Sequence, residues 1–111
     1  RLYSAYPEAS RSLHAETLHK EHLKYLDQLN IASYDPGMNQ YLSIEAIREQ
    51  TKTFFYWNLF TSRDMLLGTP ESIRDLVTES VEKGAPGIMT EICRGTPKEN
   101  VRAFLSCVQS L

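Results

Sequence analysis

The sequence predicts an α/β fold in which consecutive βα units build a parallel sheet. Short runs rich in aromatic, apolar and β-branched residues alternate along the chain with longer segments whose apolar residues recur every three or four positions. The tripeptide Gly-Thr-Pro also occurs twice, at 68–70 and 95–97, each time directly before one of these helical segments. We expect a single domain over residues 1–111, with about four parallel strands and the helices on one face of the sheet.

Composition and charge exclude several classes of protein. Of the 111 residues, 41% are hydrophobic and 23% are charged, which is typical of a globular domain rather than a disordered chain. The net charge is −2 and no block of basic residues is present, so we expect no nucleic-acid partner. The sequence has neither a bilayer-spanning apolar run nor a signal peptide, and its two cysteines make no disulfide framework. The expected setting is therefore reducing and cytoplasmic, without a membrane partner.

The first third of the chain predicts two strands with a helix between them. Residues 10–16 read as one strand, and 30–34 as a short buried strand that ends at Asp35-Pro36-Gly37, a strong turn signal. Between them, 17–29 is predicted to be one helix, and its apolar stripe comprises Leu18, His22, Tyr25, Leu26 and Leu29.

The remainder predicts two more strands and three helices. A helix at 43–50 begins with Ser43 as its N-cap, and the strand at 53–60 is dense enough in aromatic residues to be buried, or nearly buried, on both faces. A helix follows the first Gly-Thr-Pro and ends at Gly84, a strand follows at 87–92, and a helix closes the chain. The residues predicted to face the core from these last two helices are Ile73, Leu76, Val77, Val81, Val101, Phe104, Leu105, Cys107 and Val108.

The two Gly-Thr-Pro copies predict two capped helix starts. Thr69 and Thr96 are each placed to accept a hydrogen bond from an early helix amide, and the proline after each suits the first helical position. Thr96 and Glu99 also have the spacing of a capping box.

Polar residues follow the predicted strands at their carboxyl ends, where parallel β/α proteins gather their chemistry. These residues are His14, Glu16, Asp35, Asn58, Thr90, Glu91 and Cys93. His19 and His22 lie within the predicted helix and are expected to be structural.

Four segments that cover nearly the whole chain resemble consecutive units of one enzyme superfamily. They are RSLHAETLHKEHLKYLDQL at 11–29, LDQLNIASYDPGMN at 26–39, FFYWNLFTSRDMLLGTPESIRDLVTESVEKG at 54–84 and GIMTEICRGTPKENVRAFL at 87–105. The resemblance is to the uroporphyrinogen decarboxylase superfamily, which includes cobalamin-dependent methyltransferases. The last segment is similar to the closing strand, loop and helix of that superfamily, and the first resembles the segment in which its methyltransferases carry His-x-Cys-Gly.

The resemblance implies the C-terminal half of a TIM (β/α)₈ barrel, with strands five to eight. A half-barrel leaves two sheet edges and an inner face without neighbours, so we expect self-association or a missing N-terminal half as partner. Tyr34, Phe55 and Trp57 are predicted to lie on that inner face and to meet water in a lone chain. Catalysis is expected to require the missing half.

The resemblance also implies a site. Methyltransferases of this superfamily hold zinc through His-x-Cys and a later Cys; here the positions fall on His14, Glu16 and Thr90, with Cys93 three residues further on. The implied metal ligands are therefore His14, Glu16 and Cys93. Asp35, Asn58 and Glu91 are the candidate catalytic residues. For each of these side chains an ordinary structural role, such as a strand-end hydrogen bond or a helix-start charge, is the alternative.

Three functions remain open from the sequence. The favoured one is methyl transfer between a corrinoid and a thiol or a small methylated substrate, with zinc activating the acceptor and a corrinoid protein as a partner. The second is decarboxylation of a tetrapyrrole, although Met89-Thr90-Glu91 stands where that branch has Gly-His-Gly. The third is a non-catalytic half-barrel subunit or fragment.

Overall fold

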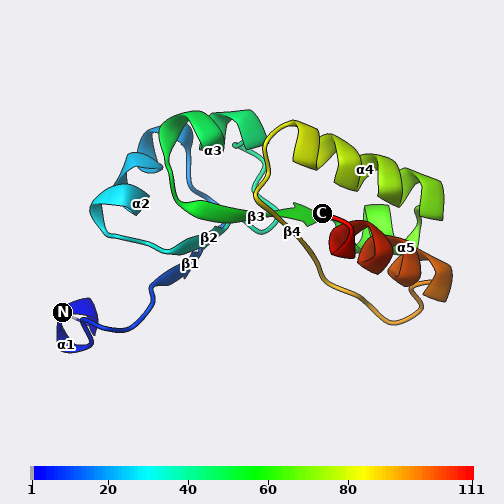
Figure 1. Cartoon of the computed structure of the whole chain (residues 1–111), viewed down its shortest axis with the longest axis horizontal. Helices are drawn as coiled ribbons and strands as arrows, with labels where there is room; N and C mark the ends of the chain where they lie inside the picture. Colours follow the sequence, from blue (N-terminus) through cyan, green and yellow to red (C-terminus); the bar gives the residue numbers. More distant parts are fainter. Residues whose placement is uncertain (1) are drawn as a thin grey trace.

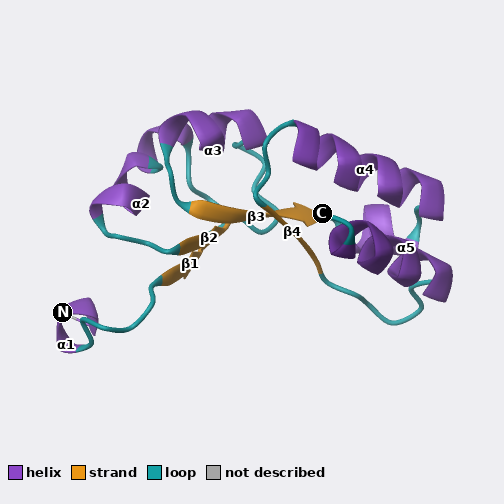
Figure 2. Ribbon diagram, in the orientation of Figure 1, coloured by secondary structure: helices purple, strands orange, loops and turns teal. Residues whose placement is uncertain are grey.

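The fold is a four-stranded parallel sheet, seen in a computed structural model that describes residues 2–111 and the side chains from Ser4 onward. The strands are β1 (Ser12–His14), β2 (Ser33–Asp35), β3 (Phe54–Leu59) and β4 (Gly87–Thr90), and they lie in the order β1-β2-β3-β4. Each neighbouring pair is parallel, so each connection crosses over through helical structure (Figure 2). The predicted parallel sheet and its four strands are confirmed.

Helical segments connect the strands (Figure 1). The described segments are α1 (Leu2–Ala5), a 3₁₀ turn η1 (Lys20–His22), α2 (Lys24–Gln28), α3 (Ile44–Gln50), a π-helical turn η2 (Thr61–Leu66), α4 (Pro70–Glu82) and α5 (Lys98–Gln109). The sequence patterns predicted neither α1 nor η2. None of the described helices has the length and apolar character needed to cross a membrane.

The segment predicted as one helix over 17–29 is two short pieces. Because the 3₁₀ turn η1 advances the chain by a different angle per residue than an α-helix, the apolar stripe changes phase between η1 and α2. Leu23 and Leu26 are buried, whereas Tyr25 is 48% exposed and Leu29 is 51% exposed. The predicted stripe is therefore wrong at Tyr25 and Leu29, and Leu23 takes their place in the core.

All packed helices cover one face of the sheet. Tyr34 and Phe55 are fully buried in a first cluster with residues of α2 and α3, including Leu26, Ile44 and Ile47. A second cluster joins the end of β3 to η2, α4 and α5; its buried members are Leu59, Met65, Ile73, Val77, Ala103 and Phe104. The expectation of helices on one face is confirmed by this packing.

The other face of the sheet is open, and this corrects two predictions. Since side chains alternate along a strand, Tyr34, Phe55 and Trp57 share the helix-covered face, and Phe54, Tyr56 and Asn58 point the opposite way. Tyr34 and Phe55 are fully buried and Trp57 packs against the first cluster, so the prediction that these three meet water is wrong. β3 is also not buried on both faces, because Phe54 is 41% exposed.

The two Gly-Thr-Pro segments start their helices differently. In the first, Thr69 Oγ1 accepts a hydrogen bond from Ser72 N at 3.1 Å and Pro70 is the first helical residue, as predicted. In the second, Thr96 Oγ1 instead donates to Cys93 O at 2.8 Å, and α5 begins one residue later, after Pro97, without a side-chain cap. The predicted cap at Thr96 and its capping box with Glu99 are wrong, because the turn from Cys93 to Thr96 uses the hydroxyl.

The glycines of these two segments also serve different purposes. A Cβ on Gly68 would overlap the Asp64 carbonyl oxygen of η2, so only glycine fits there. Gly95 instead has a φ of 91°, which residues with a side chain rarely adopt. The repeated tripeptide thus solves two separate backbone problems.

Asn100 ties the two helix starts together. Its side chain is 1% exposed, and its Nδ2 donates to Met65 O and to Gly68 O, each at 2.9 Å. The first turn of α5 thereby satisfies carbonyls at the end of η2 and before α4, and it fixes the loops at this end of the sheet.

The molecule is longer than a closed domain of its size. Its principal extents are 45 × 27 × 26 Å and its radius of gyration is 15.3 Å. A compact domain of about 100 residues has a radius of gyration of about 13 Å. Along the long axis, α1 lies away from the sheet at one end, and α4 and α5 lie at the other (Figure 1).

Candidate functional site

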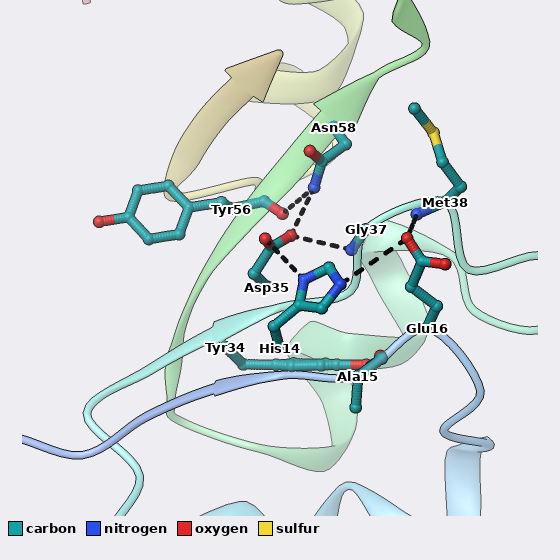
Figure 3. A network of polar contacts seen from close by, with 9 residues as sticks. All are labelled: His14, Ala15, Glu16, Tyr34, Asp35, Gly37, Met38, Tyr56 and Asn58. Carbon is teal, nitrogen blue, oxygen red and sulfur yellow. Dashed lines mark hydrogen bonds and ion pairs between the residues drawn. The ribbon is translucent and has the colours of Figure 1, made fainter. Parts of the chain in front are cut away.

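Three polar side chains meet at the carboxyl ends of β1, β2 and β3 (Figure 3). His14 Nδ1 lies 2.9 Å from Asp35 Oδ2, and Asn58 Nδ2 donates to Asp35 Oδ1 at 2.8 Å. The register explains the meeting, because His14 and Asp35 are direct partners across β1 and β2. The structure therefore brings together three of the residues that the sequence placed at this edge.

The turn after β2 fixes the Asp35 carboxylate. Gly37 N donates to Asp35 Oδ1 at 2.8 Å, which closes an Asx-type turn around Pro36. Gly37 has a φ of 56°, and a Cβ at this position would overlap the side chain of Glu16. The turn predicted from Asp35-Pro36-Gly37 is therefore present, and it also orients the carboxylate of Asp35 in the site.

Glu16 reaches the cluster from the loop after β1. Its Oε1 accepts from Met38 N at 3.2 Å and lies 3.8 Å from His14 Nε2. The buried Tyr34 hydroxyl donates to Ala15 O at 2.8 Å, and burial raises the pKa of Tyr34 to about 12, so this donor keeps its proton. These contacts hold Glu16 next to the outer nitrogen of the imidazole.

The charges of the cluster stabilise one another. The hydrogen bond with Asp35 raises the pKa of His14 above its ordinary 6.5, and burial, which is slight, opposes this rise. Burial would raise the pKa of Asp35, but hydrogen bonds from Gly37, His14 and Asn58 outweigh it and lower that pKa. The arrangement therefore favours an ionised carboxylate beside a readily protonated imidazole.

A depression of about 450 Å³ opens on the same face. It is lined by His14 and Asp35 together with Ser12, Leu13, Ser33, Tyr56 and Met89. Ser12 Oγ and Ser33 Oγ are hydrogen-bonded at 2.9 Å. The strand-end cluster is thus one wall of a shallow site that extends over the open face.

Sequence reasoning missed most of this lining. Ser12, Ser33, Tyr56 and Met89 belong to the strands but do not lie at their carboxyl ends, where the sequence placed the site. Side chains alternate between the two faces of a strand, and this alternation places the four residues on the open face with His14 and Asp35. The sequence could show this only once the pairing of residues between neighbouring strands was known.

The residues at and after the end of β4 make fewer contacts with the cluster of His14, Asp35 and Asn58. Glu91 is exposed, and its charge contributes to the raised pKa of His14. Thr90 Oγ1 donates to Leu59 O at 3.2 Å. Cys93 Sγ lies 3.6 Å from Thr96 Oγ1 within its own loop, where the cysteine is half-buried.

The donors present do not complete the expected zinc site. His14 matches a metal-binding histidine in one respect, since Asp35 holds Nδ1 and leaves Nε2 toward Glu16, as carboxylate partners of metal ligands do. Within the described part of the chain, however, no three His, Cys, Asp or Glu side chains are grouped as a metal ion requires. Cys93 does not join His14 and Glu16 in such a group.

Comparison with known proteins gives one fold relationship. The chain is similar to a methyltransferase from Methanosarcina mazei, with a TM-score of 0.75 and 16% sequence identity, over 98% of this chain and 33% of that one. No protein-family model and no curated protein matches the chain. At this identity the likeness concerns the fold, and the chain spans about a third of that methyltransferase. The chain thus has the fold of one third of a methyltransferase, with a polar cluster at the carboxyl edge of its sheet.

Proposed function

We propose that this chain is the C-terminal half of a (β/α)₈ barrel of the uroporphyrinogen decarboxylase-like superfamily, and that it takes part in corrinoid-linked methyl transfer at the carboxyl edge of its sheet. The observation that carries the proposal is the hydrogen-bonded cluster of His14, Asp35 and Asn58 at three adjacent strand ends. The similarity in fold to a methyltransferase over 98% of the chain supports the reaction class. A cytoplasmic location is part of the same proposal.

In the proposed function, the polar residues at this edge orient His14 and set the charge around it. Asp35 holds Nδ1 of His14 and directs Nε2 outward, and Asn58 and Gly37 in turn hold Asp35. Glu16 and Glu91 add negative charge at the same edge. The open face would receive the small-molecule substrate and, from a partner corrinoid protein, the methyl carrier.

Zinc remains a prediction within this proposal. Bound zinc would lower the pKa of an acceptor thiol. Of the predicted ligands, His14 and Glu16 lie near each other, with Cys93 in a separate loop. Because the described residues do not complete a zinc site, bound zinc would need a further ligand from a partner. Measuring the metal content of the chain and of its complex with any chain that co-purifies tests this part: we expect zinc in the complex and in that of His19→Ala, and its loss with His14→Ala. Equal zinc with both variants, or none in the unaltered complex, would contradict a site at His14.

A methyl-transfer assay tests the function itself. Methylcobalamin and a small thiol are mixed with the purified chain, and with its complex with any chain that co-purifies, and the absorbance of methylcobalamin is followed. We expect turnover by the complex and a loss of about tenfold or more in Asp35→Asn, because a positioning partner of this kind typically contributes that much. Inactivity of both the chain and its complex, with the fold intact, would contradict methyl transfer.

The open sheet face favours one alternative, a non-catalytic subunit that completes another protein. Phe54 is 41% exposed on this face, which is the kind of apolar surface that a partner covers. The same inactivity in the assay would support this alternative. Tetrapyrrole decarboxylation is less compatible with the site, because a polycarboxylate would meet Asp35, Glu16 and Glu91.

A further inference from the structure

On the open face, side chains that could contact a ligand lie in one row across the four strands. His14 is the partner of Asp35, and Tyr56 is the partner of Gly87. Because Tyr34 pairs with Phe55 across β2 and β3, Asp35 and Tyr56 lie side by side one residue further on, about 5 Å apart across two parallel strands. An imidazole, a carboxylate and a phenol ring therefore stand next to one another, and a position without a side chain ends the row.

Gly87 makes room for an aromatic surface. A Cβ on Gly87 would lie 2.8 Å from Phe54 Cζ and 3.0 Å from Tyr56 Cδ1, so both rings extend over the backbone of β4. The two rings meet edge to face, with centroids 5.1 Å apart at 74°. Tyr56 and Met89, whose side chain ends in a polarisable thioether, also line the 450 Å³ depression. The floor is thus aromatic and polarisable.

The charge around this floor is negative. Asp35 lines the depression, Glu16 lies 3.8 Å from His14 Nε2, and Glu91 acts on the same imidazole. No lysine or arginine is among the residues that line it in the described chain, and His14 is its one basic group. An aromatic floor beside carboxylates attracts a cation and disfavours an anion.

We infer that the depression over β1–β4 binds a small methylated ammonium group, held between the Tyr56 ring, the Met89 side chain and the Asp35 carboxylate. Methyl groups on nitrogen spread the positive charge over an apolar surface, which matches aromatic rings better than it matches water. The ligand class is therefore a methylated amine or quaternary ammonium compound rather than a carboxylate-rich molecule. As a statement about the substrate, this inference rests on the proposed methyl transfer; as a statement about binding, it stands on the site alone.

The test compares two molecules of the same shape. Choline carries a quaternary nitrogen, and 3,3-dimethylbutan-1-ol replaces that nitrogen with carbon. Each is titrated into the full chain while amide chemical shifts are recorded by NMR. We expect choline to shift the amides of Asp35, Tyr56 and Gly87 with an affinity about tenfold higher than that of the neutral alcohol, within the range of one cation–π contact. Equal affinity for the two molecules, or stronger binding of acetate, would overturn the inference.

Two variants locate the contact. Tyr56→Leu should weaken choline binding about fivefold, because it removes the ring, while Tyr56→Phe should leave it within about twofold. Tyr56 lies on the open face, and circular dichroism checks that both variants fold. If Tyr56→Leu does not fold, the choline and alcohol comparison in the unaltered chain still decides. Choline binding without methyl transfer would leave this inference standing and remove the proposed function, and methyl transfer without choline binding would do the reverse.

Discussion

The imidazole of His14 depends on one carboxylate. Asp35 contacts Nδ1 at 2.9 Å and is itself held by Gly37 and Asn58, so the ring orientation is inherited from the turn after β2. Asparagine in place of Asp35 keeps the size of the side chain but removes its charge. The single residue therefore determines both where His14 points and how readily it takes up a proton.

The pKa of His14 gives the first test at this scale. We expect NMR titration to show it above 6.5, since the hydrogen bond with Asp35 raises it, and we expect Asp35→Asn to lower it. Because the folded pKa is raised, the contribution of His14 to stability is full below its unfolded pKa and is lost as pH rises through the folded one. Asp35 has a lowered pKa, so its contribution is present above 3.8 and is lost as pH falls through its folded value. A His14 pKa unchanged by Asp35→Asn would contradict the pair.

Asn100 gives the second test. Asn100→Ala leaves the carbonyls of Met65 and Gly68 without their donor in a buried position, which should destabilise the fold by about 2 kcal/mol. Urea denaturation measures the loss, with the exposed Gln109→Ala as the control in the same helix. If both variants unfolded at the same urea concentration, Asn100 would not fasten the two helix starts.

At the scale of elements, the helices differ in the interactions that stabilise their first turns. α4 has a cap at Thr69, and Ser72 Oγ reciprocally accepts from Thr69 N at 2.9 Å. α3 has a cap at Ser43, whose Oγ accepts from Ala46 N at 3.1 Å, as the sequence predicted. α5 relies instead on the side chain of Asn100 and on the turn that holds Thr96.

Substitution of the α4 cap tests this difference. Thr69→Ala should destabilise the protein by about 1 kcal/mol, because the amide of Ser72 loses its acceptor. Thr69→Ser keeps the hydroxyl and should retain most of the stability. Thermal melts that place the two variants at the same midpoint would mean that the hydroxyl does not cap α4.

The helices and strands also explain which parts of the fold and of the site could be predicted from the sequence and which could not. Alternation of strands and helices predicted the parallel sheet, and carboxyl strand ends predicted His14, Asp35 and Asn58, because topology alone brings strand ends to one edge. The predicted face of Tyr34 and Phe55 was wrong, because β3 carries large side chains on both faces and a one-residue choice decides between them. The register then gives Tyr34 the same face as Phe55. Tyr56 and Met89 were missed for the same reason. The start of α5 was wrong because Thr96 had two acceptable hydrogen-bonding arrangements, and only the loop geometry selects one.

At the scale of the whole molecule, the open face is the main feature without a partner. The helices cover one side of the sheet, while Phe54 is 41% exposed on the other and β1 and β4 form its two edges. Strand edges and exposed aromatic rings both favour association. We therefore expect a partner to cover this side of the sheet.

Sedimentation at micromolar concentration tests this expectation. We expect a second copy or a companion chain bound to the protein, and we expect Phe54→Asp to weaken that association because it places a charge on the open face. Leu105→Asp is the control. Leu105 was wrongly predicted to face the core: it is 49% exposed and lies on α5, away from the open face of the sheet. A stable monomer, or equal effects of the two substitutions, would argue against the half-barrel.

The division of the core into two clusters has a consequence for hydrogen exchange. Phe55 belongs to the cluster under α2 and α3, Leu59 belongs to the cluster under α4 and α5, and Ile88 packs against both. Each side can then unfold locally while β3 stays bonded to the strand on its other side. The amides of β3 would exchange last, and those of the two helical layers would exchange earlier and as two separate groups. A chain with one sheet would thus open as two cooperative units that share a single strand.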